Sequence, residues 1–118
     1  MNKTKDDFLY ISHVLDSIKS VESYTRDADF EEFCANSMMY DAVIRKLQIL
    51  AESTQRISEK VKKENPQIPW RDMSGFRNIL VHDYLEGIDP KAIWDVITRD
   101  LSNLKKSFQK IKISQKES

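Results

Sequence analysis

The sequence predicts an all-α protein, an antiparallel up-and-down bundle of four to five helices. Only two glycines and three prolines occur among the 118 residues, which favours long helices and few loops. Apolar residues recur at helical spacing along most of the chain, and no segment alternates with the period of a strand. The length fits one domain, covering residues 1–118, that can bury a real core.

The first two helices are predicted from caps and apolar stripes. Thr4 can cap a first helix that extends to about Tyr24, with Asp7 as a capping-box partner. Its apolar stripe consists of Phe8, Ile11, Leu15, Ile18 and Val21. After a polar break, Asp27 or Asp29 can start a short second helix, whose early Glu31 and Glu32 suit a positive helix end.

A long third helix is expected from about Met38 to Val61. Its inner stripe consists of Met39, Val43, Leu47, Leu50, Thr54, Ile57 and Val61. Asp41 and Arg45 are four residues apart and can pair on its surface, either as a simple ion pair or as part of a site. The helix must end before Pro66, because the residue before a proline avoids helical geometry.

Prolines mark the starts of the last two helices. Pro69 suits the first position of a fourth helix, and Asp89 followed by Pro90 marks the start of a fifth. The stripe of the fifth helix consists of Ile93, Ile97, Leu101, Leu104, Phe108 and Ile111. Gly75 inside the fourth helix costs about 1 kcal/mol relative to alanine, which suggests close approach of another backbone or a ligand.

Composition narrows the function classes. The formal net charge is zero, so the chain as a whole does not attract RNA or DNA, and any contact with nucleic acid must be local. The single Cys34 excludes an internal disulfide and a multi-cysteine metal site. The N-terminus lacks an apolar signal segment and no run is long enough to span a bilayer, so we expect a cytoplasmic protein with no membrane partner.

Rare residue types gather in the segment PQIPWRDMSGFRNILVHDY, residues 66–84. Within it, Arg77, Asn78, His82 and Tyr84 place a fixed cation, an amide, an imidazole and a phenol close together. Arginine can hold a phosphate and stabilise charge that grows on it, and histidine can move the proton of a ribose 2′-hydroxyl. The segment therefore suggests RNA cleavage with Arg77 and His82 as catalytic residues and Asn78 in support. The alternative is an amphipathic helix with ordinary surface polar groups.

On an ideal helix, Arg77 and His82 lie about 140° apart around the axis. Either the helix loosens near His82, or two copies of the segment meet across a twofold axis. We favour the homodimer, because twofold dimers are the commonest oligomers and bring identical patches together. One histidine with scattered acids makes no convincing metal-ligand set, so we expect neither a metal nor another cofactor.

RNILVHDY, residues 77–84, resembles the Arg-x4-His-x-Tyr motif of HEPN-domain toxins of the HepT-like family. DAVIRKLQILAES, residues 41–53, resembles the family's third-helix signature, and residues 66–78 resemble the segment that leads into the motif. The small glycine usual in that third-helix signature is replaced near Leu50, Ala51 and Glu52. Asp41, Arg45 and Trp70 match family positions and are candidates for supporting roles.

The resemblance implies an all-helical homodimer that acts as a metal-independent endoribonuclease on tRNA or mRNA, the toxin of a type VII-like toxin–antitoxin system. It also implies a nucleotidyltransferase antitoxin that attaches AMP to the motif tyrosine, here Tyr84. Added bulk and negative charge near Arg77 would compete with an RNA phosphate. Two alternatives stay open: a non-catalytic subunit that binds nucleotide or substrate for a nucleotidyltransferase, and a bundle used only for dimerisation.

Overall fold

The protein is described by a computed structural model that covers residues 3–82 and 86–117, with side chains for residues 6–82 and 86–111. All regular structure in these residues is helical, which confirms the predicted all-α class. The helices are α1 (Lys3–Thr25), α2 (Phe30–Ala35), α3 (Ser37–Arg56), α4 (Glu59–Glu64), α5 (Trp70–His82), α6 (Pro90–Asp95), a π-helical segment η1 (Val96–Asp100) and α7 (Leu101–Glu117).

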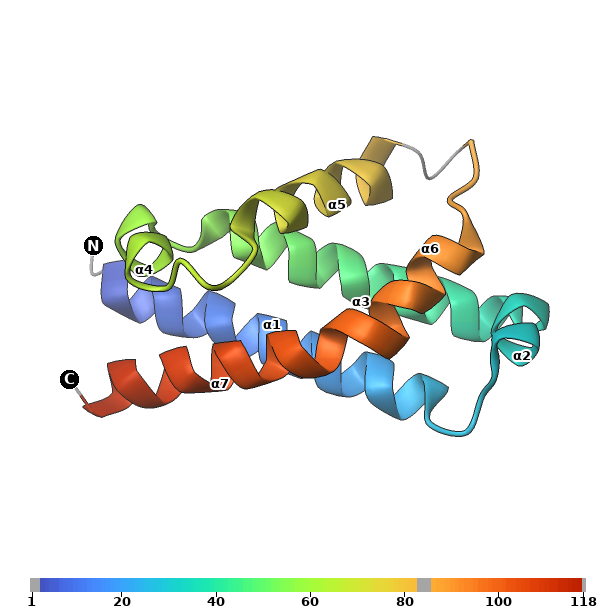
Figure 1. Cartoon of the computed structure of the whole chain (residues 1–118), viewed down its shortest axis with the longest axis horizontal. Helices are drawn as coiled ribbons and strands as arrows, with labels where there is room; N and C mark the ends of the chain where they lie inside the picture. The colour runs from blue at the N-terminus through green and yellow to red at the C-terminus, as the bar shows by residue number, and fades with distance from the viewer. Residues whose placement is uncertain (1–2, 83–85, 118) are drawn as a thin grey trace.

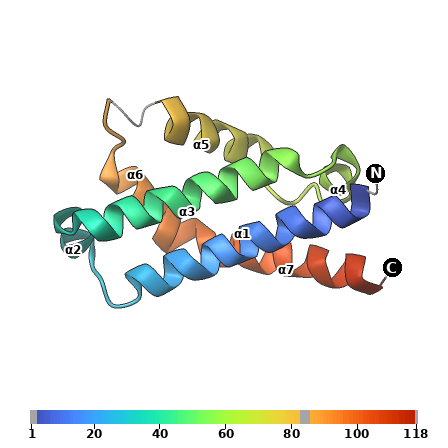
Figure 2. The same ribbon diagram turned by 180° about the vertical axis from the view of Figure 1, so that it is seen from behind.

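Four long elements alternate in direction (Figures 1 and 2). They are α1, α3, α5 and the continuous run of α6, η1 and α7. As a result, α1 begins and α7 ends at the same end of the bundle (Figure 1). The arrangement agrees with the predicted antiparallel bundle, and the short α2 and α4 lie at its opposite ends.

The core forms where the apolar stripes of these elements meet. α1 packs along α3 and α7, and α5 packs on α3. Fully buried side chains come from each long element, including Ile11 from α1, Leu47 from α3, Leu80 from α5 and Phe108 from α7. Burial of such side chains supplies the main driving force for this fold.

Local caps confirm several predicted helix starts. Asp29 caps α2 by accepting a hydrogen bond from the Glu32 N–H at 2.9 Å, and the Glu32 carboxylate accepts from the Asp29 N–H in return. Asp89 caps α6 by accepting from the Lys91 N–H at 3.0 Å. α5 begins at Trp70, one residue after the predicted position, and the Pro69 carbonyl accepts its first backbone bond from Met73.

The predicted third helix is wrong beyond Arg56, because the chain breaks there into α3 and α4. Ile57 and Ser58 have extended backbones, and the Ser58 hydroxyl caps α4 by accepting from the Val61 N–H. The carboxylate of Asp7 in α1 accepts the Ser58 N–H at 2.8 Å and the Ser58 hydroxyl at 2.7 Å. Asp7 therefore holds the break between α3 and α4, whereas the side chain of Thr4, and with it the proposed capping box, lies outside the described residues.

The fifth helix is interrupted by η1, which the sequence did not predict. Thr98 donates its hydroxyl to the Trp94 carbonyl at 2.9 Å, and a side-chain bond of this kind competes with the helical ladder and bends a helix. The predicted stripe nevertheless keeps its buried members Ile93, Leu101, Phe108 and Ile111 on the core side.

Candidate active site

A row of polar contacts joins α3 to α5, and we call it the polar seam. Ser74 donates its hydroxyl to Gln55 Oε1 at 3.4 Å, near the start of α5. Further along, the Arg77 Nε–H donates to Glu52 Oε2 at 3.2 Å. The last contact runs from Gln48 Nε2 to the Leu80 carbonyl at 3.3 Å. Because α3 and α5 are antiparallel, the seam leads from α4 towards His82 at the end of α5.

Arg77 lies at the middle of this seam. Its side chain is 34% exposed, and Glu52 binds it through Nε alone. The two terminal nitrogens have no ion pair or hydrogen bond with any residue that the structure describes. Their edge of the planar guanidinium remains available for two oxygens of a phosphate.

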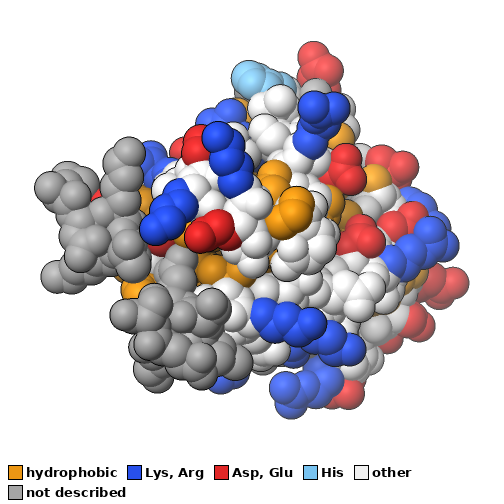
Figure 3. Space-filling view, turned by 60° about the vertical axis from the view of Figure 1, so that its left-hand side comes forward, with side chains coloured by type: hydrophobic (Ala, Val, Ile, Leu, Met, Phe, Trp, Pro, Cys, Tyr) orange, Lys and Arg blue, Asp and Glu red, His pale blue; other side chains and the backbone are white. Residues whose placement is uncertain are grey.

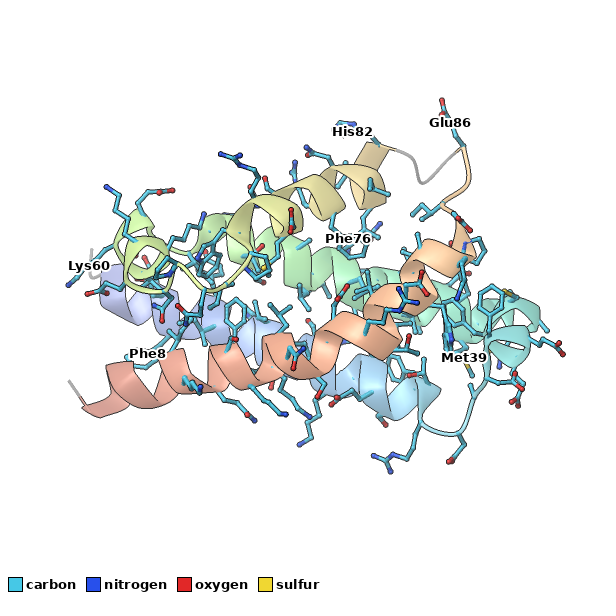
Figure 4. All side chains as sticks on the ribbon, in the orientation of Figure 1. Phe8, Met39, Lys60, Phe76, His82 and Glu86 are labelled. Carbon is cyan, nitrogen blue, oxygen red and sulfur yellow. The ribbon has the colours of Figure 1, made fainter. Side chains whose placement is uncertain are left out.

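His82 is the last residue of α5 and projects away from the bundle (Figure 4). It is exposed, as is Asn78 one turn earlier on the same face. Neither side chain has a hydrogen-bond partner among the residues that the structure covers. α5 remains α-helical up to His82, so no loosening of the helix before that residue turns the imidazole towards Arg77.

Within one chain, therefore, Arg77 and His82 lie on different faces of α5. Arg77 leans on α3 through Glu52, whereas His82 faces outward (Figure 4). This is the separation expected for residues about 140° apart on a helix. That a second chain brings both groups to one phosphate stays a prediction.

The supporting residues predicted on α3 are both exposed. Asp41 and Arg45 form no ion pair with each other, so that predicted pair is wrong. Solvation of two exposed charges competes effectively with such a surface pair. Arg45 lies about one turn beyond Gln48, towards the end of α5 that carries His82. Its supporting role stays a prediction.

Trp70 lies at the opposite end of α5 from His82. Its indole N–H donates to the Asn65 carbonyl at 3.0 Å, and its ring meets Phe108 edge-on at 5.6 Å. The Lys62 ammonium lies 5.9 Å from the ring centroid. These contacts show what holds Trp70, while its supporting role in the site stays a prediction. Tyr84, the predicted modification site, lies outside the described residues.

The outward side of α5 also carries apolar side chains. Ile79 is 43% exposed and Val81 is 49% exposed, and they flank Asn78 and His82 in the sequence. On the side facing η1 and α7, Phe76 and Ile79 line a largely apolar groove of about 670 Å³ (Figure 4). That another molecule covers these partly exposed apolar side chains stays a prediction.

Gly75 also lines this groove. An added Cβ at this position would meet no atom within 4 Å, so no other described part of this chain requires the glycine. The predicted close approach is therefore not to any described part of this chain, and a ligand or a second chain stays the prediction.

On the face drawn in Figure 3, neither sign of charge dominates among the described side chains. In Figure 3, lysine and arginine side chains alternate with acidic ones, and small apolar areas lie between them. Within residues 6–82 and 86–111, no three histidine, cysteine or acidic side chains gather in a way that could hold a metal ion. None of the helices in this part of the chain combines the length and the apolar character that a membrane span needs.

Gln48 and Glu52 contact α5 at the candidate site, and the sequence did not single them out. They follow Arg45 at helical spacing on the polar side of α3, which is the signal that could have grouped them. Spacing alone does not tell that this side faces α5, because the partners Leu80 and Arg77 lie 32 and 25 residues away.

These features describe a small all-helical protein with a half-buried arginine and an exposed histidine on one helix. Residues 14–111 match the family model described as "Ribonuclease HepT-like". A Methanocaldococcus jannaschii protein named as a putative RNase is 38% identical over 102 residues, or 86% of this chain and 91% of that protein. A Thermococcus cleftensis protein named "Probable ribonuclease HepT" is 34% identical over 103 residues, or 87% of this chain and 93% of that protein. No significant match was found among solved structures. The chain belongs to the HepT-like ribonuclease family.

Proposed function

We propose that this chain is the toxin of a toxin–antitoxin pair, an endoribonuclease that acts in the cytoplasm as a homodimer and needs no metal. The observation that carries the proposal is the open guanidinium edge of Arg77 on a helix that ends with His82, which is exposed and has no partner among the described residues. The family match to ribonucleases and the relatives named as RNases support the same chemistry.

The reaction we propose is an internal transesterification of RNA. The ribose 2′-oxygen attacks the adjacent phosphorus, the bond to the 5′-oxygen breaks, and a 2′,3′-cyclic phosphate forms. His82 takes the proton of the 2′-hydroxyl or gives one to the leaving oxygen. Arg77 binds two phosphate oxygens and stabilises the negative charge that they gain in the transition state. Asn78 contacts the sugar–phosphate backbone or orients the histidine.

A second copy of the chain would complete this site. Arg77 and His82 point to different sides of one helix, so a twofold axis beside α5 would bring the arginine of one subunit near the histidine of the other. The exposed Ile79 and Val81 supply apolar surface for that contact. Gly75, which has open space around it, permits close approach of the second helix.

Neutralisation would use the partner that the family resemblance implies. The phenol oxygen of Tyr84 attacks the α-phosphorus of ATP on the nucleotidyltransferase antitoxin, and pyrophosphate leaves. The attached AMP brings a phosphate close in sequence to Arg77 and His82 and competes with RNA for the guanidinium. We expect the intact mass of this protein to increase by AMP, attached at Tyr84, only when its gene and the antitoxin gene are expressed together.

Cleavage of bulk tRNA by Arg77→Ala and His82→Ala, followed by analysis of the RNA ends, tests the activity. We expect the parental protein to produce cyclic-phosphate ends, and we expect the cleavage rate to fall by about 100-fold or more in both variants. Arg99→Ala and His13→Ala are matched controls, because both residues are exposed and lie on other helices. If the parental protein binds the RNA and leaves it intact, the chain is a binding subunit and not a nuclease.

A further inference from the structure

The carboxylate of Glu52 lies between two guanidinium groups. Its Oε2 is 3.2 Å from Arg77 Nε, and its Oε1 is 3.6 Å from a terminal nitrogen of Arg56. Arg56 and Glu52 are one turn apart on α3, whereas Arg77 comes from α5. Glu52 is therefore the group through which α3 holds the proposed catalytic arginine.

This contact determines which edge of Arg77 faces solvent. The guanidinium is rigid and planar, so a carboxylate bound at Nε fixes the direction of the whole group. The edge formed by the two terminal nitrogens then points away from Glu52, and it has no partner among the described residues. That edge is the one that matches two phosphate oxygens.

A carboxylate near a phosphate site would by itself oppose binding. Arg56 offsets this charge, because Arg56, Glu52 and Arg77 together carry a net charge of +1. Without Arg56, the pair of Glu52 and Arg77 would be neutral. The trio therefore orients Arg77 and still presents a cation to the RNA.

We propose that Glu52 is a positioning residue for the ribonuclease reaction, holding Arg77 through Nε so that its two terminal nitrogens grip the scissile phosphate. The inference rests on the proposed function of Arg77. The contact contributes little to the fold, because the Arg77 side chain is 34% exposed and that of Glu52 is 44% exposed. The contact acts instead on the reaction rate, because a small misplacement of a catalytic group in the transition state slows the reaction greatly.

Three variants, Glu52→Gln, Glu52→Ala and Arg77→Ala, test how much the contact contributes to the cleavage rate. Glu52→Gln keeps an oxygen that can accept the Nε–H, whereas Glu52→Ala removes it. We expect kcat for a labelled tRNA transcript to fall about tenfold in Glu52→Gln and about 100-fold in Glu52→Ala, with KM changed less than threefold. Arg77→Ala should lose still more, and the melting temperatures of both Glu52 variants should stay close to that of the parental protein.

Glu59→Ala is the matched control, because Glu59 is an exposed glutamate that pairs with Lys62 on α4, outside the polar seam. It should cleave at the parental rate. If both Glu52 variants cleave at the parental rate or faster while Arg77→Ala is inactive, the positioning role is wrong and the proposed function stands. If Arg77→Ala also cleaves at the parental rate, the proposed function itself fails.

Discussion

The two ends of α5 are held in different ways. At its start, Trp70 is fixed by the Asn65 carbonyl, by the ring of Phe108 and by the nearby Lys62. At its other end, His82 is exposed and unpartnered among the described residues, and one long contact from Gln48 reaches the Leu80 carbonyl. The first end shows how α5 is fastened to the bundle, and the second leaves polar groups free for another molecule.

The same contrast separates the sides of α5. Leu80 is fully buried against the core, whereas Gly75, Asn78 and His82 form an outward stripe at helical spacing. Substitutions at the fastened end should therefore cost stability. Substitutions along the outward stripe should cost activity or association instead, and some of them should stabilise the fold.

The largest loss of stability is expected at the fastened end, from Trp70→Ala. This change removes a large ring from Phe108 and takes away one of the two donors to the Asn65 carbonyl, which keeps only the Ile68 N–H. We expect the free energy of unfolding to fall by about 3 kcal/mol, measured by urea denaturation at fixed protein concentration. Trp70→Phe, which keeps a ring and loses the N–H, should lose about 1 kcal/mol. An unchanged urea midpoint in Trp70→Ala would show that the start of α5 is not fastened by this residue.

The next largest loss of stability is expected from Asp7→Ala, because Asp7 holds the chain at the break between α3 and α4. Asp7 is 4% exposed and accepts two short hydrogen bonds from Ser58. Loss of a buried acceptor that satisfies two donors should cost about 2 kcal/mol in the same urea experiment. Asp6→Ala is the control, since Asp6 is the neighbouring acid and has no partner among the described residues. Equal stability of the two variants would contradict the anchoring role of Asp7.

The break at Ile57 shows where prediction from the sequence ends. Ile57 and Val61 continue the apolar spacing of α3, and both are buried, so the stripe predicted their burial correctly. What interrupts the helix is a carboxylate from a residue 51 positions earlier in the chain. Helical periodicity reports which side of a segment faces the core, but not which distant side chain will bind its backbone.

The caps and the site show the same difference between features that depend on neighbouring residues and features that depend on distant ones. The capping box of Asp29 and Glu32 spans only four residues, and the sequence predicted the start of α2 at either Asp27 or Asp29. The outward direction of His82 relative to Arg77 follows from the helical angle. Glu52, in contrast, becomes a site residue only because α3 and α5 pack together, and Tyr84 lies outside the described residues.

Gly75→Ala should act in the opposite direction from the changes at the fastened end. Gly75 lies inside α5, has an ordinary negative φ, and would place its new Cβ where no atom lies within 4 Å. Alanine in a helix interior is better than glycine by about 1 kcal/mol, so the free energy of unfolding should rise by that amount. The same variant should weaken the proposed homodimer, measured by analytical ultracentrifugation. A less stable variant would mean that another group occupies this place in solution.

The smallest effect on stability is expected for Asn78→Ala, which should stabilise the fold and slow cleavage at the same time. Asn78 is exposed within α5 and has no side-chain partner in the described part of the chain, so its replacement removes no contact that stabilises one chain. Because alanine favours a helix more than asparagine does, unfolding should require about 0.5 kcal/mol more free energy. Cleavage of tRNA should nevertheless slow, since Asn78 shares the outward stripe with His82. Asn103→Ala, at an exposed position of α7, should give the same small gain without the loss of cleavage. A variant at position 78 that gains stability and keeps full activity would place Asn78 outside the site and leave Arg77 and His82 to act without it.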